Sequence, residues 1–166
     1  MLSCTVENKA KSGLDKTFSR ERFDAAMKAF EGQEMLQLVL AYLEQCRANR
    51  SINNPGIPRM VRNYFLESAL WIADCARLLR PGAPFVMVND NVRYEGAHVP
   101  VDLILADFAE GLGFSVEEIW VLPHGKGNSS QQMGKHGRCE LRKCVYLWRR
   151  AKVPSSHETS DSTCWD

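Results

Sequence analysis

The sequence predicts a single α/β domain. Amphipathic helical patterns fill the first half of the 166 residues, short apolar strands lie in the second half, and a helical pattern separates two of these strands. A chain of this length can bury one sizeable core but is short for two. Hydrophobic residues make up 45% and charged residues 25% of the chain, an ordinary balance for a globular protein.

The helices are expected before the strands. Residues 1–18 show no sustained period and are expected to form an extended segment. Ser19 is a suitable N-cap for a helix over 19–30, and a second helix is expected over 33–48. A turn signal at residues 53–56 precedes Pro58, which suits the first turn of a third helix that ends near residue 80.

Three strands are expected in the second half. Residues 85–88 are apolar without alternation, which is typical of a strand covered on both faces. Pro100 opens a helix, and a strand over 116–122 follows it, so these two strands are expected to run parallel. Residues 144–148 are apolar on both faces, so this last strand is expected to be central in the sheet. We therefore expect the domain to span residues 19–150, followed by a polar, disordered tail over 151–166.

The charge is uneven along the chain. The net charge is +1, but residues 135–152 hold seven basic residues and one acid. This permits a nucleic-acid partner, although a solvated charged surface explains it equally well. The six cysteines form no Cys-x-x-Cys motif and no His pair has zinc spacing, so no metal site is expected. The polar N-terminus and the lack of an apolar run of about 20 residues predict a cytoplasmic protein with no membrane partner.

Polar side chains follow the strand over 85–88. Asn89, Asp90 and Asn91 come directly after it, with Tyr94 close behind. Ligands of open α/β sheets bind outside the carboxyl ends of the strands. Amide and carboxylate groups there could bind the edge of a flat heterocycle, and a tyrosine ring could stack on it. A turn rich in Asn and Asp would have the same composition, so substrate binding is one of two interpretations.

A glycine-rich polar loop over 123–138 is the second candidate site. Loops longer than about 12 residues in a compact domain are usually functional or disordered. Polar side chains can contact bases and phosphates, and basic ones neutralise phosphates. The candidate DNA-binding residues are Asn128, Ser129, Ser130, Gln131, Gln132, Lys135, Arg138 and Arg142. The alternative is a solvated hairpin loop, and no phosphate-loop motif is present.

Several short motifs coincide with those of one enzyme family. They are Leu-Arg-Pro-Gly at 79–82, Val-Asn-Asp-Asn at 88–91, Gly-Phe at 113–114, Gly-Asn-Ser-Ser-Gln-Gln-Met at 127–133, and Leu-Arg-Lys-Cys at 141–144, leading to Trp148. In this combination, residues 64–150 resemble the C-terminal half of a Rossmann-like, S-adenosylmethionine-dependent DNA amino-methyltransferase. Such enzymes modify cytosine N4 or adenine N6. The resemblance implies a partial Rossmann-like fold, with helices followed by a three-stranded mixed sheet of order 5-7-6 whose last strand is antiparallel.

The chain departs from this family in two motifs. It lacks the Phe-x-Gly-x-Gly turn that holds the cofactor, and it has no Pro-Pro pair and hence no catalytic Ser/Asp/Asn-Pro-Pro-Tyr motif. The resemblance therefore implies a fragment with no catalytic and no cofactor-binding residues of its own, inactive alone. S-adenosylmethionine and DNA would be ligands of the complete enzyme, with an upstream polypeptide carrying the cofactor half. The alternatives are a fragment of an RNA methyltransferase, a non-catalytic nucleic-acid-binding module and a non-functional remnant.

Overall fold

The structure is a computed structural model that describes residues 19–123 and 140–151. Within these ranges, the helices α2 (Arg20–Gly32), α3 (Glu34–Ala48) and α4 (Ile57–Leu78) come first. The remaining elements are β1 (Pro84–Asp90), β2 (Val92–Tyr94), β3 (Ala97–Val99), α5 (Val101–Gly111), β4 (Phe114–Val121) and β5 (Lys143–Arg150). The predicted segment 1–18, the loop from residue 124 and the tail from residue 152 lie outside the described residues.

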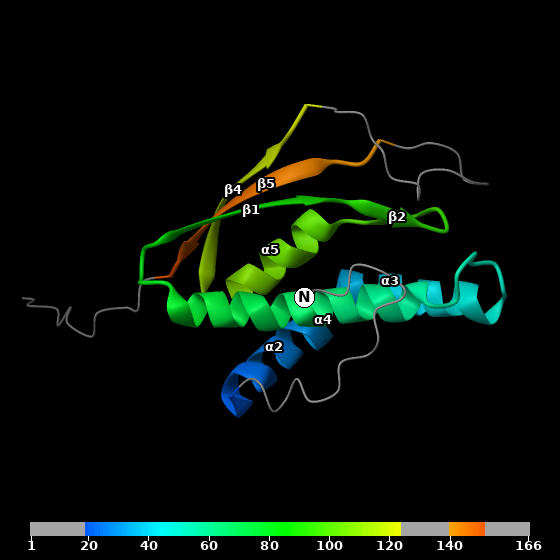
Figure 1. The fold of residues 1–166 in the computed structure, drawn as a ribbon, viewed down its shortest axis with the longest axis horizontal. Helices are drawn as coiled ribbons and strands as arrows, with labels where there is room; N and C mark the ends of the chain where they lie inside the picture. The colour runs from blue at the N-terminus through cyan, green and yellow to red at the C-terminus, as the bar shows by residue number, and fades with distance from the viewer. Residues whose placement is uncertain (1–18, 124–139, 152–166) are drawn as a thin grey trace, which may run out of the picture.

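Helix α4 runs along the long axis of the molecule (Figure 1). Its buried side includes Val61, Phe65 and Ile72, which recur at helical spacing. Pro58 lies in its first turn, where a missing N–H removes no helical hydrogen bond. The helix ends at Leu78, and Gly82, with φ at 81°, allows the turn that leads into β1. The sequence placed this helix within two residues of its observed ends.

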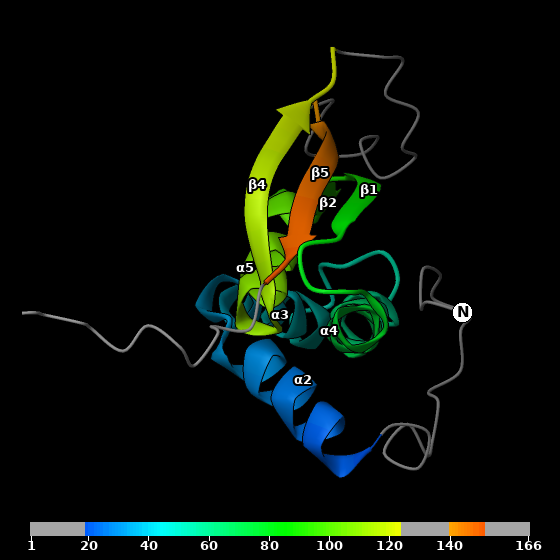
Figure 2. The same cartoon turned by 90° about the vertical axis from the view of Figure 1, so that its left-hand side faces the viewer.

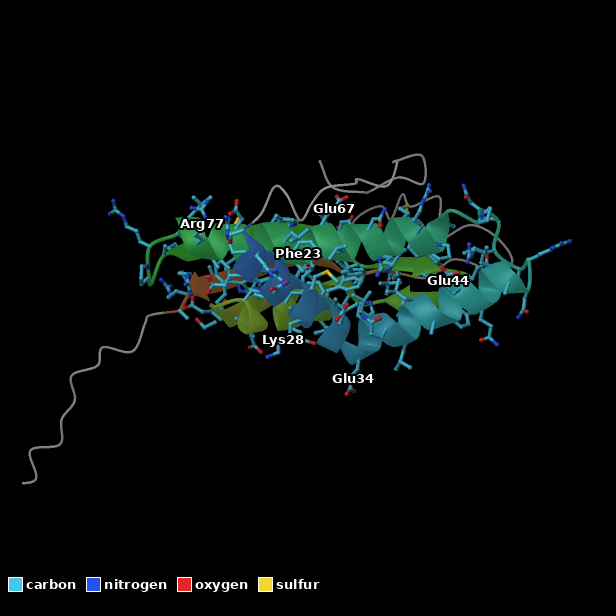
Figure 3. The ribbon with its side chains drawn as sticks, turned by 90° about the horizontal axis from the view of Figure 1, so that it is seen from below. Phe23, Lys28, Glu34, Glu44, Glu67 and Arg77 are labelled. Atoms are coloured by element: carbon cyan, nitrogen blue, oxygen red, sulfur yellow. The ribbon has the colours of Figure 1, made fainter. Side chains whose placement is uncertain are left out.

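Helix α2 crosses α4 on the side away from the sheet (Figure 3). Ala26 and Phe30 are its buried residues, and Arg22 forms an ion pair with Asp74 of α4. Glu34, at the start of α3, points outward in Figure 3. Helix α2 thus lies beneath α4, whereas α3 runs beside α4 (Figures 2 and 3).

Strand β5 lies in the middle of the three-stranded sheet. The strand order is β1-β5-β4, and β5 is antiparallel to both neighbours. Strands β1 and β4 therefore run parallel, and their carboxyl ends lie at the same edge (Figure 2). The α/β class is confirmed. The last strand is central and antiparallel to both neighbours, as expected. Each pairing in this sheet is antiparallel, because β5 separates the two parallel strands.

Helices cover one face of this sheet. In Figures 1 and 2, α5 and α4 both lie on the same side of it. Tyr146 and Trp148 of β5 face the helices and are 0% exposed, whereas Val86 and Val88 of β1 are 62% and 52% exposed. Within the described residues, the prediction that β1 is covered on both faces is therefore wrong. Its outward side chains are apolar, as a covered strand would require, but no described element packs on them.

Aromatic rings fill the space between the sheet and the helices. The rings of Phe85 and Trp148 stack with centroids 5.4 Å apart, and Phe114 lies 5.9 Å from Trp148 on the neighbouring strand. Tyr146 and Trp71 extend this cluster along β5 and α4. Trp148 therefore contacts aromatic side chains from both outer strands and holds the sheet together from its centre.

Two tryptophans on neighbouring strands test this description. Replacement Trp148→Ala should lower the free energy of unfolding by about 3–5 kcal/mol, because it removes a buried ring and leaves a cavity. Trp120→Ala is the matched control, since Trp120 is 54% exposed and should cost less than about 1 kcal/mol. Urea denaturation followed by circular dichroism measures both. Equal losses for the two variants would contradict the assigned inner and outer faces.

Candidate functional site

The carboxyl end of β1 carries two of the predicted substrate-binding residues. Asn89 and Asp90 belong to the strand and pair with Cys144 and Lys143 of β5. The expectation that the strand stops at Val88 is therefore wrong, because pairing with β5 continues for two more residues. The Asn89 amide donates a hydrogen bond to the hydroxyl of Tyr64 on α4. The Asp90 side chain is 60% exposed, and its carboxylate lies 3.8 Å from the ammonium group of Lys143.

Asn91 has a structural role at the start of α5. It is 8% exposed, and its side-chain oxygen accepts a hydrogen bond of 3.0 Å from the backbone N–H of Asp102. Its own backbone N–H donates to the carbonyl of Arg142 at 2.8 Å. Asn91 thus satisfies one of the free N–H groups at the helix N-terminus and joins β1, α5 and the segment before β5.

Tyr94 lies in a hairpin that the sequence did not predict. Strands β2 and β3 are joined by Glu95 and Gly96, both with positive φ, as in a type I′ turn. The Glu-Gly pair could have indicated this hairpin turn, but it predicts a type I′ turn less strongly than an Asn-Gly pair does. Tyr94 is 8% exposed and belongs to the hydrophobic core. Its ring therefore offers little free surface on which a base could stack.

A buried carboxylate lies beside these residues. Asp102 is 1% exposed, and its Oδ2 atom lies 3.0 Å from an Nη atom of Arg142 and accepts a hydrogen bond from the Cys144 thiol. Its Oδ1 atom accepts from the backbone N–H of Leu103, where the helix dipole favours a negative charge. Arg142, predicted to bind DNA, is thus held by Asp102, with 47% of its side chain exposed.

Burial raises the pKa values of two groups next to Asp102. Burial, followed by the hydrogen bond to Asp102, raises the pKa of Cys144 to about 11. Burial also raises the pKa of Tyr146 above its ordinary value, with a further contribution from Asp102. Its hydroxyl has no hydrogen-bond partner among the described residues. Both groups are therefore neutral at pH 7, and Cys144 is not a ready nucleophile.

A pocket of about 280 Å³ opens at this edge of the sheet. It combines an amide, an imidazole, a carboxylate and a guanidinium from segments that are distant in the sequence. Its lining residues are Asn91, His98, Val99, Pro100, Glu140, Leu141 and Arg142. It therefore joins Asn91, a predicted substrate-binding residue, to Arg142, a predicted DNA-binding residue. His98 was not predicted as a site residue, because the hairpin that brings it there was missed, and Glu140 was not predicted either.

The remaining predicted DNA-binding residues cannot be placed. The residues that lie outside the described part of the chain are Asn128, Ser129, Ser130, Gln131, Gln132, Lys135 and Arg138. Arg142 is the one member of the predicted set that the structure describes. The loop that contains the others connects β4 to β5, and its described ends lie at the sheet edge where β1 also ends (Figure 2).

Among the described residues, no glycine turn directly follows a strand of the three-stranded sheet. The glycine turn of an S-adenosylmethionine site follows a strand, whereas Gly82 and Gly113 precede β1 and β4, and Gly96 lies in the hairpin. In the same part of the chain, no group of three His, Cys, Asp or Glu side chains could hold a metal ion. No helix there is both long and apolar enough to cross a membrane.

Comparison with known proteins gives the family resemblance. The chain is 54% identical over 150 residues to the Type II methyltransferase M.AvaI of Nostoc sp. (strain PCC 7120 / SAG 25.82 / UTEX 2576), a match to 90% of this chain and 30% of that protein. This chain is similar to part of a Type II methyltransferase. M.BsoBI of Geobacillus stearothermophilus is 41% identical over 154 residues, again 90% of this chain and 30% of the relative. M.BglII of Bacillus subtilis is 35% identical over 81 residues, 47% of this chain and 22% of that protein.

The chain thus spans about 30% of the length of the first two methyltransferase relatives. The predicted resemblance to a methyltransferase is confirmed by these matches. No family model matches the chain. No solved structure matches it either.

Replacing the two partners of the Asp102–Arg142 ion pair should destabilise the fold by different amounts. Arg142→Gln should lower the free energy of unfolding by about 2–3 kcal/mol, because it leaves a buried carboxylate without its cation. Asp102→Asn should cost only about 1 kcal/mol, because the half-exposed guanidinium of Arg142 can turn to water. The double variant should therefore be more stable than Arg142→Gln alone. Urea denaturation at pH 7 measures all three, and additive losses would show that the two side chains are not coupled.

Proposed function

We propose that this chain is part of a DNA amino-methyltransferase that transfers a methyl group from S-adenosylmethionine to cytosine N4 or adenine N6. The observation that carries the proposal is the 54% identity to the Type II methyltransferase M.AvaI across 90% of the chain. The family motifs at residues 79–82, 88–91 and 127–133 narrow the methyltransferase class to the amino-methyltransferases. In this assignment β1, β5 and β4 are the fifth, seventh and sixth strands of a Rossmann-like sheet.

The contribution of this chain would be a wall of the target-base pocket. Asn89 and Asp90 end the strand β1 at the sheet edge where ligands of α/β proteins bind, and the pocket beside Asn91 opens at the same edge. Asp90 is the most available of these groups, because its exposed carboxylate has only a distant ion pair. A carboxylate there can accept a hydrogen bond from the exocyclic amine of a base that has been turned out of the duplex. Tyr94, being buried, would support the hairpin and not stack on the base.

DNA contacts would come from the segment between β4 and β5. Arg142 at its end is held by Asp102 and lines the pocket, so its free N–H groups are positioned for a phosphate or a base edge. The contact with DNA would continue along the loop through the other predicted residues, which are Asn128, Ser129, Ser130, Gln131, Gln132, Lys135 and Arg138. The buried carboxylate thus positions a cation at the place where a polyanion would approach.

The catalytic groups and the cofactor site would lie in the rest of the enzyme. The described residues provide no glycine turn for S-adenosylmethionine, so we assign no step of the transfer to them. What these residues supply is shape and charge beside the reacting base. Holding the base in place is itself a large part of catalysis when two reactants must meet.

A chimera tests the proposal. It consists of Nostoc M.AvaI with the 150 matched residues replaced by those of this chain. We expect the chimera to transfer labelled methyl groups from S-adenosylmethionine to duplex DNA, because the replacement supplies a complete enzyme. Mass spectrometry of the digested DNA should find N4-methylcytosine or N6-methyladenine. Unaltered M.AvaI is the positive control, and structured RNA is offered as the alternative substrate.

The chain alone provides the negative control. We expect isothermal titration of the chain with S-adenosylmethionine to give no measurable heat of binding. Micromolar affinity would contradict the proposal that the cofactor site lies in the rest of the enzyme. A chimera that unfolds cooperatively but methylates neither substrate would contradict the proposed function. Methylation of RNA alone would assign the chain to an RNA methyltransferase, and duplex binding without methylation would favour a non-catalytic module.

A further inference from the structure

Arg142 is held at both ends by contacts that cross the domain. Its carbonyl oxygen accepts a hydrogen bond of 2.8 Å from the backbone N–H of Asn91, where β1 ends. Its guanidinium lies 3.0 Å from the Oδ2 atom of Asp102, which is 1% exposed. The carboxylate is itself fixed, because its Oδ1 atom accepts from the backbone N–H of Leu103 in the first turn of α5. Both the backbone and the head group of Arg142 therefore have a set position.

Asp102 uses only part of this guanidinium. One Nη atom faces the carboxylate, and the other N–H groups of Arg142 form no hydrogen bond with another described residue. The side chain is 47% exposed and lines the pocket at the sheet edge. The remaining N–H groups are therefore available to a ligand at that edge. Since an arginine carries five N–H donors and no acceptor, such a ligand must offer acceptors.

The surroundings of Arg142 favour a base edge over a phosphate. The charge of Arg142 is already balanced by Asp102, and the carboxylate of Glu140 lines the same pocket. A phosphate would therefore meet two negative groups beside one cation. Val99 and Leu141 make part of the wall apolar, which suits an uncharged planar ring. A head group held in one direction also suits acceptors in fixed positions, as on the edge of a base.

Among the bases of a duplex, guanine matches a group that only donates. Its major-groove edge presents two acceptors, N7 and O6, and a planar guanidinium can donate to both. Adenine presents one acceptor beside an amine, thymine presents one acceptor beside a methyl group, and cytosine presents an amine. An arginine that approaches these three edges leaves a donor unpaired or meets another donor. The chemistry of Arg142 therefore selects guanine.

We propose that Arg142 is a specificity residue that donates two hydrogen bonds to one guanine of the recognition sequence, and that Asp102 is its positioning residue. The inference rests on the proposed function. The guanine would lie close to the target base, because Arg142 lines the sheet edge at which Asp90 is proposed to contact that base. A contact between Arg142 and a phosphate is the competing role.

The variant Arg142→Lys in the M.AvaI chimera separates the two roles. Lysine keeps the positive charge beside Asp102 but cannot donate two parallel hydrogen bonds. The chimera is incubated with a pool of randomised duplexes, and sequencing of the bound fraction gives the base preference at each position. We expect Arg142→Lys to lower the preference for guanine at one position by about tenfold or more. The salt dependence of binding to a non-specific duplex should not change, because the charge is retained.

Two further variants and a modified duplex complete the test. Asp102→Asn should lower the preference at the same position by about threefold or more, because the guanidinium loses its orientation. Arg47→Lys is the matched control and should change nothing, since Arg47 is 54% exposed in a 2.6 Å ion pair on α3. Replacing the selected guanine with 7-deazaguanine, which lacks the N7 acceptor, should weaken binding by the unaltered chimera about fivefold and binding by Arg142→Lys hardly at all. If Arg142→Lys does not unfold cooperatively in urea, Asp102→Asn takes its place with the modified duplex.

Three results would overturn the proposal. The first is a chimera that shows no preference for guanine, or one whose preferences are unchanged in Arg142→Lys. The second is equal weakening on all sequences with a shallower salt dependence, which would assign Arg142 to a phosphate. The third is a lost preference for a base other than guanine. A chimera that methylates DNA with unchanged preferences refutes this inference alone. A guanine preference that depends on Arg142, without methylation by the unaltered chimera, refutes the proposed function alone.

Discussion

The pairing of β5 with both of its neighbours is the constraint on which the rest of the structure depends. Strands β1 and β4 form no backbone pairing with each other, so the sheet exists only because β5 lies between them. Trp148 of β5 packs against Phe85 and Phe114 and fixes the spacing of the outer strands. The same arrangement places the carboxyl ends of β1 and β4 beside the first residues of β5. The candidate site is therefore a consequence of the strand order.

Polar groups at this edge are connected through buried contacts. Asn91 caps α5, and Asp102 in the first turn of α5 holds Arg142 and accepts a hydrogen bond from Cys144. Since one carboxylate satisfies a cation, a thiol and a backbone N–H, the position of Arg142 follows from the position of the helix. Asp90, by contrast, remains exposed. The edge thus combines a rigid cation with an available carboxylate.

The sequence predicted what depends on local pattern and missed what depends on distant pairing. The long helix was predicted because apolar residues such as Phe65 and Ile72 recur at helical spacing. The two-sided apolarity of 85–88 was interpreted as coverage on both faces, yet the described part of the chain covers only one. The Asp102–Arg142 pair joins residues 40 positions apart and leaves no periodic signal. The hairpin containing Tyr94 was missed because three-residue strands are too short to show a pattern, so the tyrosine was expected beside a ligand and not in the core.

The claim that connects fold and function is that the carboxyl end of β1 contacts the target base. Replacing Asp90 with alanine in the M.AvaI chimera tests it most directly, with Asp24→Ala as the control, since Asp24 is an equally exposed carboxylate in a 3.8 Å ion pair on α2. Our account predicts that Asp90→Ala lowers kcat/KM for methyl transfer to duplex DNA by about tenfold or more, with unchanged stability, while Asp24→Ala has no effect. Equal activity of the two variants would contradict it.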